Sequence, residues 1–155
     1  MYKFRFVVLG MVILCLSGCG KFDIIHEPVP EILQAEKVCI IDHVATRETF
    51  RTTLKQWLRQ EGITPEMMPD DSGDDVCEWT LRYYGKWSWD VALYLADTQI
   101  TAYHDGLEAG RVGMKIGQFD AYKWENGQER IFKLMDMLSG KVDQYKLNVP
   151  EKKNK

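Results

Sequence analysis

The fold class is decided by residues 77–84, which read Cys77-Glu78-Trp79-Thr80-Leu81-Arg82-Tyr83-Tyr84. Apolar or aromatic side chains alternate here with mostly polar ones. This period-two pattern is typical of a β-strand with one packed face and one wet face. The stretch therefore predicts a sheet that is covered on one side.

Further strand signals follow in the chain. Residues 89–103 predict a long strand, and the parity of its apolar positions changes after Asp97, so we expect a β-bulge within residues 96–99. Gly85-Lys86 is interpreted as the turn before this strand. Asp105-Gly106 predicts a tight hairpin turn into a strand over 107–116.

Two helices are predicted on either side of these strands. The first begins at Thr46 as N-cap, after a short buried strand over 38–41, and ends at Gly62; an edge strand over 63–68 follows. The second begins near Trp124 and ends at Gly140. The apolar positions at helical spacing are Phe50, Leu54, Trp57, Leu58, Ile131, Leu134, Met135 and Leu138.

These elements predict an α+β fold with one mixed sheet, a β-α-β-β-β-α order and both helices packed on one face. Numbered along the chain, the strands are expected in the spatial order 2-1-3-4-5. We expect the helix-covered face to bury Trp57, Trp79, Leu93 and Leu138 together. The second face, bearing Arg82, Tyr84 and Tyr94, is expected to be partly exposed.

The N-terminus predicts a lipoprotein signal. Lys3 and Arg5 precede eleven almost wholly apolar residues, 6–16, and Leu16-Ser17-Gly18-Cys19 resembles a bacterial lipobox. Cleavage before Cys19 would leave this cysteine with a thioether-linked diacylglycerol and an N-acyl chain such as palmitate. The alternative is a transmembrane helix, which is disfavoured because eleven residues rise only about 16 Å, roughly half the hydrocarbon core.

The signal divides the chain into four predicted parts. Residues 1–18 are the signal peptide, 19–36 the lipidated cysteine and a proline-containing tether, 37–140 the α+β domain, and 141–155 a polar tail. Because Gly20 rather than Asp follows the cysteine, resemblance to the enteric sorting rule favours the periplasmic face of the outer membrane.

Cysteine usage fits an oxidising compartment. Of the four cysteines, Cys15 would leave with the signal and Cys19 would carry lipid, so Cys39 and Cys77 remain as a candidate disulfide. The alternative is a pair of buried thiols. No metal or cofactor is expected, because no further ligand lies at a usable spacing.

Charge narrows the function classes. The net charge of −3 becomes −5 once Lys3 and Arg5 are removed with the signal, and an acidic domain is a poor candidate for nucleic-acid binding. The expected partners are the membrane, through the lipid anchor, and a periplasmic or envelope protein.

Three segments carry a family resemblance: 38–42, 77–81 and Trp87-Ser88-Trp89-Asp90-Val91-Ala92-Leu93-Tyr94. With them the chain resembles the Sbal-type family of small proteobacterial lipoproteins over roughly residues 37–138. The resemblance brings no known activity or functional residues. The order of elements is also similar to the small α/β domains of periplasmic lipoproteins that bind and activate envelope enzymes.

Catalysis is not expected, because no nucleophile-elbow, zinc-protease or phosphate-loop motif is present. The alternative is a small-molecule-binding or hydrolytic protein that uses Asp90 and one of the three histidines, His26, His43 or His104.

A protein-binding module is the preferred interpretation. Four basic residues spaced by four positions share one face of the first helix. Trp and Tyr are common interface anchors, and four such aromatics lie near a strand end, Tyr83, Tyr84, Trp87 and Trp89. The candidate partner-binding residues are Arg47, Arg51, Lys55, Arg59, Arg82, Trp87 and Trp89. The alternatives are a solvated helix face and tryptophans that fill the core.

Overall fold

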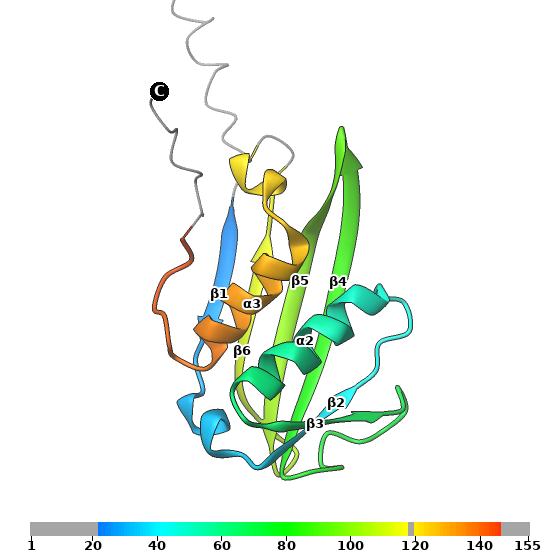
Figure 1. The fold of residues 1–155 in the computed structure, drawn as a ribbon, viewed down its shortest axis with the longest axis vertical. Helices are drawn as coiled ribbons and strands as arrows, with labels where there is room; N and C mark the ends of the chain where they lie inside the picture. Colours follow the sequence, from blue (N-terminus) through cyan, green and yellow to red (C-terminus); the bar gives the residue numbers. More distant parts are fainter. Residues whose placement is uncertain (1–21, 118–119, 147–155) are drawn as a thin grey trace, which may run out of the picture.

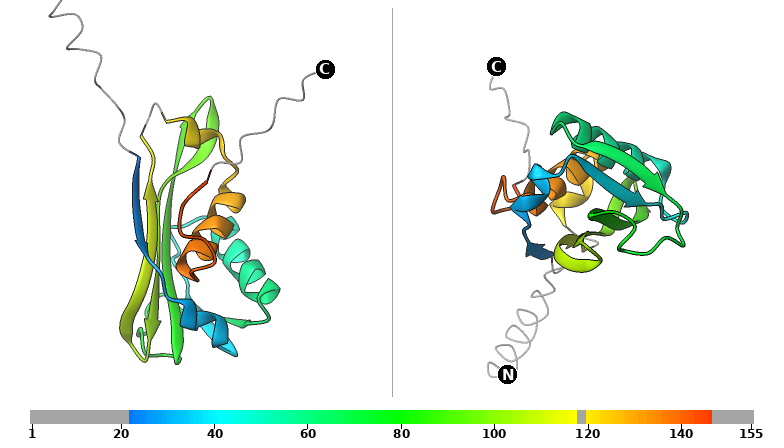
Figure 2. Two further views of the ribbon diagram at one scale, coloured as in Figure 1. Left: turned by 90° about the vertical axis from the view of Figure 1, so that its left-hand side faces the viewer. Right: turned by 90° about the horizontal axis from the view of Figure 1, so that it is seen from below.

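In the computed structural model, which describes residues 22–117 and 120–146, six strands form one sheet in the order β1-β6-β5-β4-β2-β3. The two α-helices lie on one face of it, and the other face is open over much of its area (Figures 1 and 2). The elements in chain order are β1 Asp23–Glu27, the 3-10 helix η2 Pro30–Gln34, β2 Lys37–Ile41, α2 Glu48–Gln60, β3 Thr64–Met68, β4 Trp79–Asp90, β5 Ala92–His104, β6 Leu107–Lys115, the 3-10 helix η3 Ala121–Trp124 and α3 Gly127–Leu138.

The predicted α+β class is confirmed. β2 pairs in parallel with both β3 and β4, while β4, β5, β6 and β1 pair antiparallel, so the sheet is mixed. The order β3-β2-β4-β5-β6 is the predicted order of the five expected strands. β1 is an additional strand at the edge of β6.

β1 and η2 correct the predicted tether over residues 19–36. Ile24 packs against the core, His26 Nε2 lies 3.0 Å from the Met137 carbonyl oxygen, and Val29 N–H donates to the Leu138 carbonyl. The prolines suggested a linker, but Pro30 begins η2 instead. Five residues with a polar residue at each end give too weak an alternation to identify a strand from the sequence.

The β4–β5 hairpin is longer than predicted, because β4 runs through Gly85 and turns only at Val91. A Cβ on Gly85 would lie 2.8 Å from Phe50 Cδ2, so this glycine allows α2 to pack closely on the strand. The predicted bulge is confirmed: Asp97 pairs with Lys86 and Leu95 with Trp87, which leaves Ala96 as the extra residue. The turn at Asp105-Gly106 is also confirmed, with φ of 50° and 79°.

Thr46 is not the N-cap of α2, because the helix begins at Glu48 and Arg47 takes the cap position without a side-chain hydrogen bond. The predicted apolar positions of both helices are buried. α3 begins at Gly127 and not near Trp124, and the Asn126 side chain accepts a hydrogen bond from Gln128 N–H at 2.8 Å. Gly62 and Gly140 follow the helix ends with positive φ, as glycines at these positions do.

The predicted core is confirmed for Trp57, Trp79 and Leu138 but wrong for Leu93, which is 45% exposed. The outer part of the β4–β5 hairpin extends past the helices, so they do not cover Leu93 (Figure 1). On the second face, Arg82 and Tyr84 are partly exposed as expected, but Tyr94 is buried, at 6% exposure.

The domain also extends beyond residue 140, because Tyr145 packs against the core and its hydroxyl donates to Glu125. This corrects the start of the predicted polar tail; residues 147–155 lie outside the described part. Within the described residues, no helix is both long and apolar enough to cross a membrane.

Candidate functional site

A groove of about 520 Å³ lies where the loop before α2 meets the C-terminal half of β4. It is bounded by the start of α2 on one side and by the β4–β5 hairpin on the other. We call it the aromatic–basic groove. Its lining residues are His43, Ala45, Arg47, Tyr84, Gly85, Lys86, Trp87, Ser88, Trp89 and Leu93.

A polar network fixes the loop at the base of this groove. Asp42 accepts a hydrogen bond from Tyr83 Oη at 3.0 Å and forms an ion pair with Arg51 at 2.9 Å. Thr46 Oγ1 accepts from Gly85 N–H at 3.1 Å and lies 2.7 Å from His43 Nδ1. The loop is therefore bonded to both α2 and β4, which gives the groove a rigid floor.

Tyr83 is the buried centre of the network. Its ring stacks on Phe50 with centroids 4.9 Å apart, and burial raises the pKa of the phenol to about 12. At neutral pH the hydroxyl therefore keeps its proton and donates a hydrogen bond to Asp42. This geometry suits a structural hydrogen bond and not a catalytic base.

Arg47 and Trp87 form one wall of the groove. The Arg47 guanidinium carbon lies 5.6 Å from the Trp87 ring centroid, within the range of a cation–π contact. A Cβ on Gly127 would lie 2.3 Å from Trp87 Cη2, so the glycine at the start of α3 makes room for this ring. The Trp87 Nε1–H is buried and has no hydrogen-bond partner among the described residues.

The structure brings together three of the seven candidate partner-binding residues, namely Arg47, Trp87 and Trp89. Arg51 is paired with Asp42 and Glu48, and neither Lys55 nor Arg59 lines the groove. Arg82 lies on the opposite face of the sheet, where it pairs with Asp74 and donates to the Ser72 carbonyl.

Sequence reasoning missed His43, Lys86 and Ser88 as members of this groove. Lys86 and Ser88 could have been identified by predicting that the strand continues through Gly85. Such a strand places both residues next to Trp87 at the groove.

Asp90 and the histidines do not form a common site in the described contacts. Asp90 pairs with Lys123 at 2.5 Å. His26 contacts Met137, His43 lies in the groove, and the His104 ring lies 4.5 Å from Trp79 between centroids. A hydrolytic pairing of Asp90 with a histidine would require a rearrangement of these contacts.

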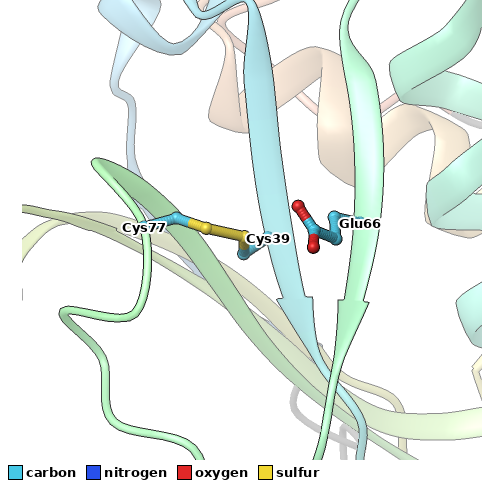
Figure 3. Close-up of side chains that lie close together, drawn as sticks. All are labelled: Cys39, Glu66 and Cys77. Atoms are coloured by element: carbon cyan, nitrogen blue, oxygen red, sulfur yellow. A yellow bond between two sulfur atoms is a disulfide. The ribbon is translucent and has the colours of Figure 1, made fainter.

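Cys39 and Cys77 are joined by a disulfide, as predicted, with their Cα atoms 6.0 Å apart (Figure 3). Glu66 lies beside them because β3 pairs with β2 in parallel and places Glu66 opposite Cys39. The sequence analysis missed this third potential ligand. Bridged sulfurs are not thiolate ligands, and Glu66 pairs with Lys37 at 3.0 Å, so this group is a structural link.

Val91 turns the β4–β5 hairpin with a φ of 62°, which is strained for a β-branched residue. We expect Val91→Gly to stabilise the fold by about 1 kcal/mol, because glycine adopts this conformation without a steric penalty. Urea unfolding followed by tryptophan fluorescence measures the change. Val44→Gly, at an equally exposed valine with a negative φ, is the control and should give no gain.

Comparison with known proteins gives similarity of fold only. A dodecameric PelC from Paraburkholderia phytofirmans superposes with a TM-score of 0.51 at 12% identity over 77% of this chain and 98% of that one. A variant of the same protein, in a second crystal form, gives a TM-score of 0.50 at 12% identity over 77% and 97%. A minor lipoprotein from Acinetobacter baumannii gives only 0.33 at 18% identity over 70% and 89%. Neither the family models nor the curated proteins give a match, so the Sbal-type resemblance stays a prediction.

Proposed function

We propose that this chain is a lipid-anchored protein of the cell envelope whose α+β domain is a non-enzymatic protein-binding module. Acylated Cys19, which lies outside the described residues, would hold it at the periplasmic face of the outer membrane. Because Cys39 and Cys77 are bridged, the domain suits an oxidising compartment.

The observation that carries the binding role is the composition of the aromatic–basic groove. Its described lining combines Arg and Trp, two of the residue types that dominate binding energy at interfaces, and includes no carboxylate. Arg47 and Lys86 supply positive charge in a domain that is acidic as a whole. The groove therefore fits an extended acidic segment of a partner protein.

The polar groups near the groove support binding better than chemistry. Asp42 is held by Arg51 and Tyr83, and Tyr83 keeps its proton. His43 also lies in the described lining, and its Nδ1 is engaged with Thr46 Oγ1 at 2.7 Å. A general base would need a reacting partner within hydrogen-bond reach.

A photo-crosslinking amino acid placed at Ser88, inside the groove, tests the proposal in intact cells. We expect a covalent adduct with an envelope protein from this position and none from Gln60, which is exposed at the far end of α2. Equal labelling from both positions would contradict a groove-specific partner. The PelC structures are dodecamers, so an adduct between two copies of this chain would indicate self-assembly instead.

Charge reversal at Arg47 supplies the matched test. An arginine anchor is worth about 2 kcal/mol or more at an interface, so Arg47→Glu should weaken partner binding by roughly thirtyfold or more. Arg59→Glu makes the same charge change in the last turn of α2, outside the groove, and should have little effect. The measurement is the yield of the Ser88 adduct in the two variants.

The anchor is tested separately by metabolic labelling with a fatty acid. We expect label in the parent and none in Cys19→Ser, whose hydroxyl cannot form the thioether. A parent that carries no label and fractionates with the cytosol would overturn the localisation.

A further inference from the structure

The outer end of the β4–β5 hairpin carries three apolar side chains that the fold leaves in solvent. Trp89 and Leu93 face each other across the strands and are 75% and 45% exposed, and Val91, between them at the turn, is 77% exposed. We call these three residues the apolar tip. Monomeric soluble proteins rarely gather exposed apolar side chains in this way without an interaction that covers them.

The sheet register places this tip at the end where the described chain begins. Asp23, the first residue of β1, pairs with Lys115; Lys115 pairs with Asp97, and Asp97 with Lys86. These four residues form one row across the sheet. Trp89 lies three positions beyond the row along β4, and Figure 1 shows the hairpin extending beyond the start of β1 at this end.

The reach of the chain brings the predicted lipid to the same level. At about 3.3 Å per residue, Trp89 stands roughly 10 Å beyond the row. Cys19 precedes Asp23 by four residues, which span at most about 14 Å. Acyl chains on Cys19 can therefore enter a bilayer at the height of the apolar tip.

We propose that the apolar tip inserts into the membrane interface beside the acyl chains on Cys19. Trp89 and Leu93 form the outer end of the aromatic–basic groove, so this contact leaves Arg47 and Trp87 as the groove residues that meet a protein partner. The inference rests on the lipid anchor proposed above and adds a second, protein-borne contact with the bilayer. Tryptophan favours the membrane–water interface, and Val91 and Leu93 can enter the acyl boundary below the headgroups. Asp90, the charged residue of the turn, is neutralised by Lys123.

Two further observations support this orientation. Trp124, in η3 at the same end, is 58% exposed and supplies a second interfacial aromatic (Figure 1). At the opposite end Leu107 is 75% exposed but lies next to Asp105, Glu78 and Glu108, whose charge opposes entry into a bilayer.

The test uses the full lipidated chain reconstituted in phosphatidylethanolamine–phosphatidylglycerol vesicles. Val91→Cys adds a free thiol to a chain whose mature cysteines are acylated or bridged, so an environment-sensitive fluorophore can be attached there alone. Leu107→Cys is the matched control, an exposed apolar residue at the start of β6, next to the hairpin turn at the other end. We expect a blue shift and protection from an aqueous quencher for the Val91 label, and neither for the Leu107 label.

The outcomes separate this proposal from the proposed function. Flotation of the protein with vesicles while both labels remain accessible to the quencher would overturn tip insertion and leave the anchor intact. Absence of flotation would overturn the anchor and the tip contact together. Protection of the Val91 label in native envelopes but not in protein-free vesicles would assign the tip to a protein partner and overturn the lipid contact.

A second variant guards against a label that inserts by its own affinity for lipid. Trp89→Glu in the Val91→Cys background leaves the label in place and adds a charge at a position exposed enough not to disturb the fold. We expect this variant to lose the blue shift. Retention of the full shift would show that the label, and not the tip, enters the bilayer.

Discussion

Replacement of Glu125 by leucine is expected to cost about 3–5 kcal/mol of folding stability, because it leaves a buried arginine without its carboxylate. Glu125 and Arg130 are both almost completely inaccessible to solvent, with side-chain exposures of 4% and 0%. Lys133 and Tyr145 also donate to Glu125, and Arg130 donates to the carbonyl of Leu95 on β5. One carboxylate thus connects α3, the C-terminal segment and, through Arg130, the sheet.

Urea unfolding gives the size of this effect, and Glu129→Leu is its control. Glu129 lies in the first turn of α3, four residues after Glu125, but is exposed, so its loss should cost less than about 1 kcal/mol. Adding Arg130→Met to Glu125→Leu should recover part of the loss, because the buried positive charge that Glu125 balanced is then removed as well. Equal effects of the Glu125 and Glu129 substitutions would show that the buried cluster contributes no special stability.

The sequence predicts the parts of the fold that repeat a pattern over many residues. The alternation in residues 77–84 and the parity change after Asp97 identify β4, β5 and the bulge at Ala96. Both apolar helix faces follow from their 3.6-residue period. Short elements such as β1 were missed, because five residues with a polar side chain at each end and a proline after them carry too little pattern.

The candidate site is harder to predict because its residues meet only through tertiary packing. In the sequence Gly85 resembles a turn signal, and Gly127 a poor helix start. In the structure the Phe50 ring packs on Gly85 and the Trp87 ring on Gly127, so neither position has room for a Cβ. Thr46 resembles an N-cap, but its hydroxyl is used by Gly85 on β4. A local pattern cannot show contacts between residues 39 or 40 positions apart, so the groove is visible only in the folded chain.

Removal of the Cys39–Cys77 bridge is expected to have the other large effect. The bridge closes a loop across a sequence separation of 38, which is worth about 3–4 kcal/mol in the chain-entropy account. Cys39 lies on β2, and since Val38 and Ile40 on either side of it belong to the helix-covered core, its side chain lies on the opposite face. The bridge therefore fastens the loop before β4 to the strand between β3 and β4.

Cys39→Ala/Cys77→Ala should lower the unfolding midpoint by roughly 10 °C. Adding a reductant to the parent should lower it by a similar amount and leave the double variant unchanged, which separates loss of the bridge from loss of two side chains. Arg82 also holds this loop through Asp74 and Ser72, so the variant should keep its fold and its Ser88 crosslink at low temperature. A parent that is insensitive to reductant would show that the loop is held by these polar contacts and not by the bridge.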